Sequence, residues 1–365
     1  MKAMAVRPAE RRLELVDHPE PVATSPTDVT LEMIRVGVCG TDREIARFEY
    51  GTPPAGSPYL VIGHESLARV TATGPGVSGW ARGDLAVVMV RRPCARPDCD
   101  ACRAGRQDFC RTGEYTERGI KGQHGFMTRT IVDDARWLVK VPPALLDVAV
   151  LVEPLTIAEK ALLEVDAMLD RMPWRRGSPE GLSAVVLGGG PVGLLGAMAL
   201  AASGCRVTLV SKQPAGDVRG SLLPQMGGRY VSAETDSLTT IFGRLGRVDL
   251  VYEATGAAPP AFEALGALGP NGLFVFTGVP GRKGMPDVDG GALMRSLVLN
   301  NQVALGTVNA GRDAFEAAVA HLGQFMQRWP GAVRALLTAH LPLEDAPGAL
   351  TGAADGIKTV IELGG

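Results

Sequence analysis

Four cysteines lie close together in a segment rich in Pro, Asp, Gly and Arg: Cys94, Cys99, Cys102 and Cys110. Their spacing is typical of a metal-binding loop, and four thiolates complete the tetrahedral shell that Zn²⁺ prefers. The pattern predicts a structural zinc site in a lobe of about residues 91–112. Because sulfur would fill every position, this metal would brace the loop and leave no room for a substrate. Free or redox-active thiols are the alternative.

A glycine-rich turn follows a short apolar run later in the chain. Gly188, Gly190 and Gly193 match the pattern G-x-G-x-x-G, with Val192 inside it. In a strand–turn–helix unit the first glycine permits the tight turn, the second lets the backbone approach a pyrophosphate, and the third allows close packing of the helix. The helix N-terminus also stabilises negative charge. The sequence therefore predicts a dinucleotide site, with a merely tight turn as the alternative.

The end of the next expected strand indicates which dinucleotide is bound. The run 206–210 leads into Ser211 and Lys212, where an NAD-preferring site usually has Asp or Glu for the ribose 2′-hydroxyl. A hydroxyl and a cation suit a 2′-phosphate instead. NADP is the predicted cofactor and NAD remains possible. The alternative interpretation of Lys212 is a solvated loop side chain.

The elements that must position these motifs fall into two regions. Residues 1–150 carry short apolar runs between turn signals, which is typical of a β-rich domain. Farther on, strands alternate with helical stretches, which favours a doubly wound parallel sheet with helices on both faces. The predicted fold class is therefore α/β. The expected strands are 29–36, 68–73, 85–90, 127–132, 137–141, 184–187, 206–210, 250–252 and 272–277, and a helix is expected over 155–169.

Length, composition and charge exclude several classes of protein. A chain of 365 residues, with 46% apolar and 21% charged residues, predicts two globular domains. A net charge of −2 without a basic run argues against nucleic acid as a partner. No signal-peptide core is visible at the N-terminus. The uncharged stretch 182–205 is interrupted by the glycine turn, so it is not expected to span a membrane. A cytoplasmic protein without membrane contact is expected.

Several motifs together resemble one family. The strings GVCGTD (residues 37–42), GHE (63–65), the four-cysteine lobe and GGGPVG (188–193) resemble the zinc-dependent medium-chain dehydrogenase/reductase superfamily. The strings GEYTERGIKGQHGFM, VEPLTIAEKAL, YEATG, TGVPG, GTVNA and IKTVIEL resemble its glucose dehydrogenase branch. The resemblance covers essentially the whole chain. It implies a GroES-like catalytic domain of residues 1–156 and 301–365, and an inserted Rossmann domain of residues 157–300.

The resemblance also implies a second, catalytic zinc site. Cys39 and His64 match zinc ligands of the family. Glu65 and Glu153 match carboxylates that bind the metal directly or through water, and Thr41 matches a proton relay beside the reacting oxygen. Spacing alone would not unite these residues, because a lone cysteine or a histidine beside a glutamate is more often structural.

Further residues are implied for the cofactor and the substrate. Glu114 matches a residue that binds sugar hydroxyls, and Asn309 one that lies between the nicotinamide and the sugar. Asn300 stands where some members carry a histidine near the substrate. Thr277, Gly278 and Val279 match the loop that lines the nicotinamide, and Thr255 and Gly256 are further cofactor-binding residues that the resemblance implies.

The reaction implied is zinc-dependent transfer of a hydride from C1 of a glucose-type aldose to NADP⁺, which yields an aldonolactone. Asn300 and Ile157 depart from residues that some members place near the sugar. A polyol, cyclitol or aminocyclitol dehydrogenase with the same zinc and NAD(P) machinery therefore stays open. A non-catalytic NADPH- and zinc-binding protein is the alternative of another class, although the complete set of metal ligands argues against it. The family also implies a homo-oligomer, either a dimer or a tetramer.

Overall fold

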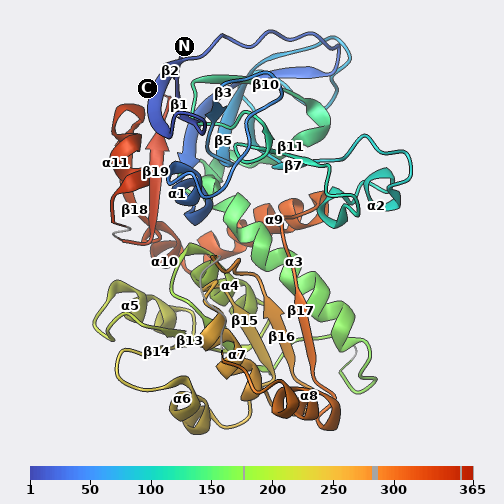
Figure 1. The fold of residues 1–365 in the computed structure, drawn as a ribbon, viewed down its shortest axis with the longest axis vertical. Helices are drawn as coiled ribbons and strands as arrows, with labels where there is room; N and C mark the ends of the chain where they lie inside the picture. The colour runs from blue at the N-terminus through green and yellow to red at the C-terminus, as the bar shows by residue number, and fades with distance from the viewer. Residues whose placement is uncertain (176, 282–286, 354–355, 365) are drawn as a thin grey trace. The chain divides into compact units, whose positions relative to one another are not determined.

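The computed structural model describes residues 1–175, 177–281, 287–353 and 356–364. It divides into two compact units (Figure 1). Unit 1 comprises Met1–Thr156, Asn309–Met326 and Val333–Gly365, and unit 2 comprises Ile157–Val308 and Gln327–Ala332. Residues 301–308 therefore belong to unit 2, whereas the sequence assigned them to the catalytic domain.

Unit 1 consists mainly of β-strands. Its strands are β1 (Lys2–Arg7), β2 (Arg12–Asp17), β3 (Asp28–Gly37), β4 (Leu60–Val61), β5 (Glu65–Thr73), β6 (Leu85–Val88), β7 (Arg91–Arg92), β8 (Thr116–Arg118), β9 (Gly122–Gln123), β10 (Thr130–Asp134), β11 (Leu138–Val141), β18 (Leu337–Pro342) and β19 (Lys358–Glu362). Its helices are α1 (Gly40–Ala46), α2 (Asp100–Arg103) and α11 (Ala346–Thr351), while α3 (Val152–Leu169), α9 (Arg312–Arg328) and α10 (Pro330–Arg334) cross the unit borders.

A seven-stranded sheet with β3 near its middle organises unit 1. Antiparallel β5 pairs along one edge of β3 and places Glu65 opposite Gly37. On the other edge β19 pairs with the end of β3, where Val360 lies opposite Gly37. The first residues of β5 and β19 therefore lie at the end of β3 from which the chain enters α1.

Unit 2 is built around a six-stranded sheet in which every pair of neighbouring strands is parallel. The strand order is β14-β13-β12-β15-β16-β17. Its strands are β12 (Ser183–Leu187), β13 (Arg206–Ser211), β14 (Arg229–Ser232), β15 (Leu250–Glu253), β16 (Leu273–Phe276) and β17 (Val303–Gly306). Its helices are α4 (Pro191–Ala202), α5 (Val218–Gln225), α6 (Leu238–Leu245), α7 (Ala258–Gly266) and α8 (Gly290–Leu299).

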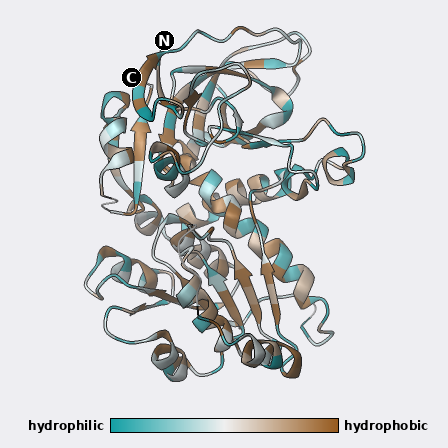
Figure 2. Cartoon of the chain, viewed as in Figure 1, coloured by the Kyte–Doolittle hydropathy of each residue, from teal (hydrophilic) through white to brown (hydrophobic). Residues whose placement is uncertain are grey.

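Helices cover both faces of this sheet. Leu250 and Tyr252 line a small cavity together with residues of α3 and α4. Val251 and Phe274 point to the other face and pack with apolar residues of α6 and α7. Because both faces are buried, the central strands are mostly apolar (brown in Figure 2), apart from Ser183 at the start of β12 and Glu253 at the end of β15. The predicted α/β class with a doubly wound parallel sheet is confirmed.

Every expected strand and the expected helix overlap an observed element. The sequence analysis did not predict the two edge strands of the parallel sheet, β14 and β17. The edge strands β14 and β17 hold partly exposed residues, so their apolar pattern is weak. Among the described residues, no helix is both long and apolar enough to cross a membrane.

Candidate active site

Three side chains with metal-binding atoms converge in unit 1. The Cys39 thiol, an imidazole nitrogen of His64 and a carboxylate oxygen of Glu65 all lie within 4.8 Å of one another. Cys39 is the N-cap of α1, and Glu65 opens β5 directly after His64. Both His64 and Glu65 are buried, and Cys39 is half-buried. Sulfur, nitrogen and oxygen donors in this number suit a catalytic zinc ion, which keeps one position open.

Asp42 orients this cluster, and the sequence did not single it out. It is fully buried, and its carboxylate accepts hydrogen bonds from the backbone N–H groups of Cys39 at 2.9 Å and Gly63 at 3.2 Å. Its Oδ1 also lies 3.3 Å from Nδ1 of His64, which leaves Nε2 for a metal. Burial opposes protonation of His64, yet the neighbouring Asp42 carboxylate holds the pKa of this imidazole well above its usual value. A carboxylate behind a ligating histidine fixes the ring and strengthens the ligand.

We expect Asp42→Asn to weaken zinc binding by about 10- to 100-fold, because the amide cannot accept all three contacts and stabilises the imidazole less. Competition with a chromophoric chelator would measure this affinity. Asp28→Asn is the matched control, since Asp28 also accepts two backbone N–H bonds in unit 1 but lies outside the cluster. Equal zinc affinity in the Asp42 variant and the wild type would contradict the role assigned to Asp42.

Lys358 is a second residue of this site that the sequence did not reveal. Its ammonium group donates to Glu65 Oε1 at 2.6 Å and to the carbonyl of Val38 at 3.1 Å. Both charged side chains are buried. A Cβ on Gly37 would lie only 2.0 Å from Glu65 Oε2, so the carboxylate rests directly on this glycine. Glu65 is therefore held between the metal cluster and an internal cation.

Glu153 and Thr41 lie near the cluster but outside the set of converging ligand atoms. Glu153 stands in the first turn of α3. Burial raises the pKa of its carboxyl above the usual value, and Glu65 raises it further while His64 lowers it. The Glu153 carboxyl therefore interacts electrostatically with both residues. Thr41 lies in the first turn of α1, two residues beyond Cys39, and is half-buried.

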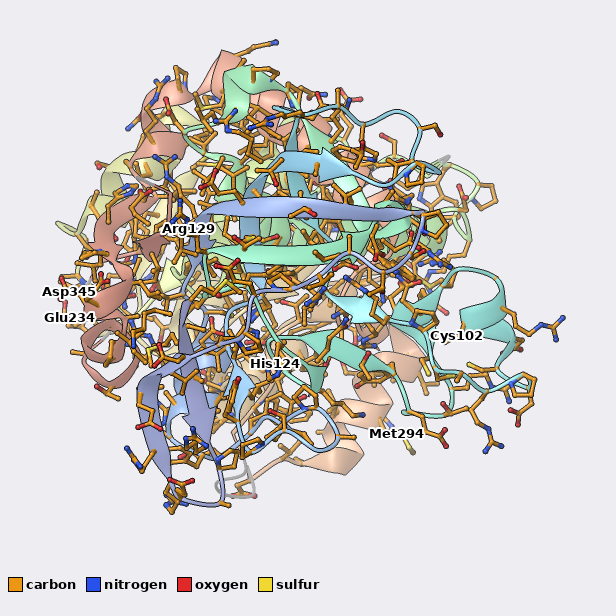
Figure 3. All side chains as sticks on the ribbon, turned by 90° about the horizontal axis from the view of Figure 1, so that it is seen from above. Cys102, His124, Arg129, Glu234, Met294 and Asp345 are labelled. Atoms are coloured by element: carbon orange, nitrogen blue, oxygen red, sulfur yellow. The ribbon has the colours of Figure 1, made fainter. Side chains whose placement is uncertain are left out.

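The four cysteines of the lobe also converge. The sulfur atoms of Cys94, Cys99, Cys102 and Cys110 all lie within 4.8 Å of one another. All four are free thiols, and Cys102 is labelled on the loop around α2 in Figure 3. This arrangement fits the tetrahedral zinc site that the spacing predicts. The site needs no residue from outside the loop.

The glycine turn of unit 2 has the strand–turn–helix setting that its motif requires. Gly188 follows β12 with φ of +107°, a backbone conformation that favours glycine. Gly190 caps α4, and the space where its Cβ would be is open. A Cβ on Gly193 would lie 1.9 Å from the carbonyl oxygen of Gly188, so the helix can pack onto the turn only with glycine there. Val192 is half-buried in the first turn of α4.

The residues at the end of β13 surround the same turn. Ser211 is buried and its hydroxyl donates to the side chain of Gln213, while Lys212 is exposed. Arg219, which the sequence did not reveal, donates from Nε to the carbonyl of Gly189 at 2.7 Å and pairs with Asp217. A serine, a lysine and an arginine thus gather beside the glycine turn, a set of groups that can bind a phosphate.

Two loops that carry predicted cofactor residues meet beyond the ends of β15 and β16. Thr255 and Gly256 follow β15, and Thr277, Gly278 and Val279 follow β16. A Cβ on Gly256 would lie 2.8 Å from the carbonyl oxygen of Val279, so the loops touch. The side chain of Val279 is 73% exposed and thus open to a ligand.

Asn300 lies away from the loops that follow β15 and β16. It caps the C-terminus of α8, and its carbonyl accepts the Asn271 N–H at 2.7 Å, just before β16 begins. It therefore lies at the amino-terminal edge of the parallel sheet, whereas ligands bind beyond the carboxyl ends of such strands. This placement does not support a contact with the substrate within unit 2, and the contact stays a prediction.

The other two predicted substrate residues belong to unit 1. Asn309 has a φ of +58° and donates from its amide to Glu117 at 3.0 Å, so a buried carboxylate fixes its orientation. Glu114 is exposed, and its carboxylate lies 4.0 Å from Arg96. Their contact with a sugar stays a prediction.

His124 is held by the protein itself. Its Nδ1 accepts the backbone N–H of Val61 at 3.1 Å, and its ring stacks on Tyr59 with 5.3 Å between centroids. Burial lowers the pKa of His124 to about 4, and the charges of His18 and Arg118 add to this effect. The imidazole is therefore neutral in the folded protein at pH values where the unfolded chain protonates it.

Because the pKa of His124 is lower in the folded protein than in the unfolded chain, the folded protein loses stability as the pH falls. Between about pH 6.5 and 4 the unfolded state binds the additional proton, so the free energy of unfolding decreases as the pH decreases. His124→Asn, which retains an acceptor for Val61, should flatten this part of the profile. Urea midpoints at pH 7 and pH 4.5 would test this, and parallel profiles for the variant and the wild type would contradict it.

Comparisons with known families cover both units. Residues 25–143 match the alcohol dehydrogenase GroES-like domain, and residues 146–363 match the glucose dehydrogenase C-terminus. The second match alone spans more than half of the chain.

Individual relatives are similar over their full lengths. A glucose 1-dehydrogenase of Thermoproteus tenax is 41% identical over 100% of this chain and 99% of its own length. Glucose 1-dehydrogenase 1 of Caldivirga maquilingensis is 40% identical with the same coverage. The structure of Haloferax mediterranei glucose dehydrogenase in complex with NADP, Zn and gluconolactone has a TM-score of 0.89 and 31% identity, and the match covers 100% of both chains.

Proposed function

The chain belongs to the glucose dehydrogenase branch of the zinc-dependent medium-chain dehydrogenase/reductase superfamily, and on this premise we propose that it oxidises C1 of a glucose-type aldose with NADP⁺. The hydride on C1 passes to the nicotinamide, and the C1 hydroxyl loses its proton. The products are an aldonolactone, NADPH and a proton. The observation that carries the proposal is the complete Cys39, His64 and Glu65 cluster in a chain that also has a complete dinucleotide turn.

The residues of unit 1 supply binding and proton transfer. Cys39, His64 and Glu65 would hold a zinc ion, with Glu153 as a further carboxylate beside them. Bound zinc acts as a Lewis acid that makes a substrate hydroxyl more acidic. The Thr41 hydroxyl, in the first turn of α1, can take up the proton and pass it outward. Asp42 keeps the imidazole in one orientation through the reaction.

The residues of unit 2 fit NADP. The open backbone at Gly190 and the N-terminus of α4 suit the pyrophosphate. Ser211, Lys212 and Arg219 offer a hydroxyl and two cations for the 2′-phosphate of the adenosine ribose. No acidic residue follows Val210 directly, which disfavours NAD.

A substrate panel tests the proposal. The purified protein should reduce NADP⁺ faster than NAD⁺ with glucose, galactose or xylose, and a lactone should form. Myo-inositol and a simple alcohol serve as comparison substrates. If a protein that binds zinc and NADPH reduced NADP⁺ with none of the aldoses, an aldose substrate would be contradicted. A cyclitol or another ring alcohol would then be favoured as the substrate.

We also propose a homodimer that forms through the open edge of the parallel sheet. β17 ends the sheet and has no partner on its outer edge among the described residues. The preceding helix α8 exposes Met294, Val298 and Leu299 to between 64% and 69% (Met294 is labelled in Figure 3). An open strand edge with an apolar helix face favours association.

Light scattering after size exclusion tests the dimer. The wild type should elute as a dimer or a larger even oligomer, and Met294→Lys with Val298→Lys should yield a monomer. Val22→Lys, at a residue of unit 1 that is 77% exposed, is the control. A monomeric wild type at micromolar concentration would contradict the proposal.

We expect the enzyme to act in the cytoplasm. All six cysteines are free thiols in the structure. Thiolates that serve as metal ligands persist in a reducing compartment, where disulfides are rare.

A further inference from the structure

Glu253 is a buried carboxylate at the carboxyl edge of the parallel sheet. It is the last residue of β15, its exposed fraction is 1%, and it lies opposite Leu187, the residue before the glycine turn. The sheet extends in opposite directions from the β12–β15 pair. Glu253 therefore lies at the point where the strand order reverses, which is where open α/β sheets bind dinucleotides.

Glu253 joins the two loops that follow β15 and β16. Its Oε1 accepts hydrogen bonds from the Thr255 N–H at 2.6 Å, the Thr255 hydroxyl and the Gly256 N–H at 3.0 Å. Its backbone carbonyl accepts the Thr277 N–H and hydroxyl at 3.0 and 2.7 Å. A Cβ on Gly278 would lie 2.9 Å from Glu253 Oε2, so the second loop rests on the carboxylate.

The charge of Glu253 is dispersed but not neutralised by a cation. Its three side-chain donors are two amides and a hydroxyl. Within the part of the chain that the structure describes, no ion pair involves this carboxylate. A charge in a protein interior acts over a longer distance than one in water, because the effective dielectric constant is lower. Its negative potential therefore extends to the surface of the two loops that it joins.

The nicotinamide half of a bound dinucleotide would lie at the half of the sheet that contains β15 and β16. The glycine turn would hold the pyrophosphate, and the adenosine ribose would then lie at the end of β13, beside Ser211. The remaining half therefore extends over β15 and β16. The nicotinamide ring carries a positive charge in NADP⁺ and is neutral in NADPH, so a nearby carboxylate interacts differently with the two forms.

We propose that Glu253 is a positioning residue that also favours NADP⁺ over NADPH, through its buried charge beneath the nicotinamide loops. This inference rests on the proposed function, since it requires that unit 2 binds NADP. It assigns two effects to one side chain. The hydrogen bonds fix the loops for either form of the cofactor, and the charge selects the form that accepts a hydride. Reduction of the ring would remove the attraction and ease product release.

Binding constants of Glu253→Gln would separate these effects. The amide has nearly the same shape but carries no charge. The dissociation constant of NADPH is measured by its fluorescence, and those of NADP⁺ and 2′,5′-ADP by competition. We expect the ratio of the NADP⁺ constant to the NADPH constant to rise about 3- to 10-fold. The constant for 2′,5′-ADP, which lacks the nicotinamide, should change less than about 2-fold.

Glu263→Gln is the matched control. Glu263 also accepts hydrogen bonds from the backbone N–H and hydroxyl of one threonine, Thr239, at 2.7 and 2.8 Å. This contact is exposed and lies between α6 and α7. Its loss should leave the NADP⁺ to NADPH ratio unchanged.

The outcomes distinguish the inference from the proposed function. If Glu253→Gln weakened the binding of NADP⁺ and NADPH by the same factor, Glu253 would only fix the loops, and the proposed charge effect would be overturned. Failure of the wild type to bind all three ligands would overturn the NADP assignment as well. Should Glu253→Gln not fold, Thr255→Val removes one donor and leaves the charge in place. In Thr255→Val the ratio of the NADP⁺ dissociation constant to the NADPH dissociation constant should stay the same or fall. A 3-fold rise of this ratio would contradict the inference.

Discussion

Replacing Cys39 with alanine should lower kcat/KM for aldose oxidation by at least about 1,000-fold, since a catalytic metal supplies several kcal/mol of transition-state stabilisation. Among the residues that the structure describes, the thiol is one of three ligand atoms that converge at this site in unit 1. Its loss leaves His64 and Glu65, and the Lys358 ammonium competes for the latter. Steady-state rates with NADP⁺ and saturating zinc would measure the effect.

The same variant should bind NADPH as the wild type does, because the glycine turn lies in unit 2. Cys205→Ala is the matched control. Cys205 is also a buried thiol, but it belongs to unit 2, where its Sγ donates to the carbonyl of Pro179 at 3.3 Å. Retention of more than a tenth of the activity by Cys39→Ala would contradict the role of the cluster.

Replacing Lys358 with methionine should lower the free energy of unfolding of the zinc-free protein by about 3–5 kcal/mol. The change leaves the Glu65 carboxylate buried without its cation, and the carbonyl of Val38 loses a donor. Bound zinc would replace part of the lost positive charge, so zinc should restore more stability to the variant than to the wild type. Zinc affinity should rise accordingly.

Urea unfolding with and without zinc, followed by circular dichroism, would measure both effects. Lys2→Met is the control, because its ion pair with Asp17 is equally short at 2.7 Å but exposed. Such a pair contributes about 0–1 kcal/mol. If both variants lost the same stability, the buried pair would have no special role. If zinc stabilised Lys358→Met no more than the wild type, the charge argument would be wrong.

Local spacing predicted the parts of the site that the chain forms over short distances. The four cysteines of the lobe lie within one loop, and the glycine turn lies within one strand–turn–helix unit. In both cases the covalent chain itself brings the groups together. The catalytic cluster differs, because His64 and Glu65 meet Cys39 only through the pairing of β3 with β5. Family resemblance, and not spacing, united these residues in advance.

The residues that the sequence did not reveal depend on tertiary contacts. Lys358 reaches Glu65 over 293 positions of the chain, through the pairing of β19 with β3. Arg219 contacts the glycine turn from α5, which follows the next strand. Asp42 stood within a recognised motif, and its position three residues after a candidate ligand at a helix start was the one available signal.

The central claim is that this chain moves a hydride from C1 of an aldose to NADP⁺. Glucose deuterated at C1, incubated with the zinc-loaded protein and NADP⁺, tests it most directly. We expect the deuterium to appear at C4 of the nicotinamide in NADPH, with gluconolactone as the other product and with loss of the reaction after chelation of zinc. NADPH without the label, or no reduction by a protein that demonstrably binds zinc and NADPH, would contradict the claim.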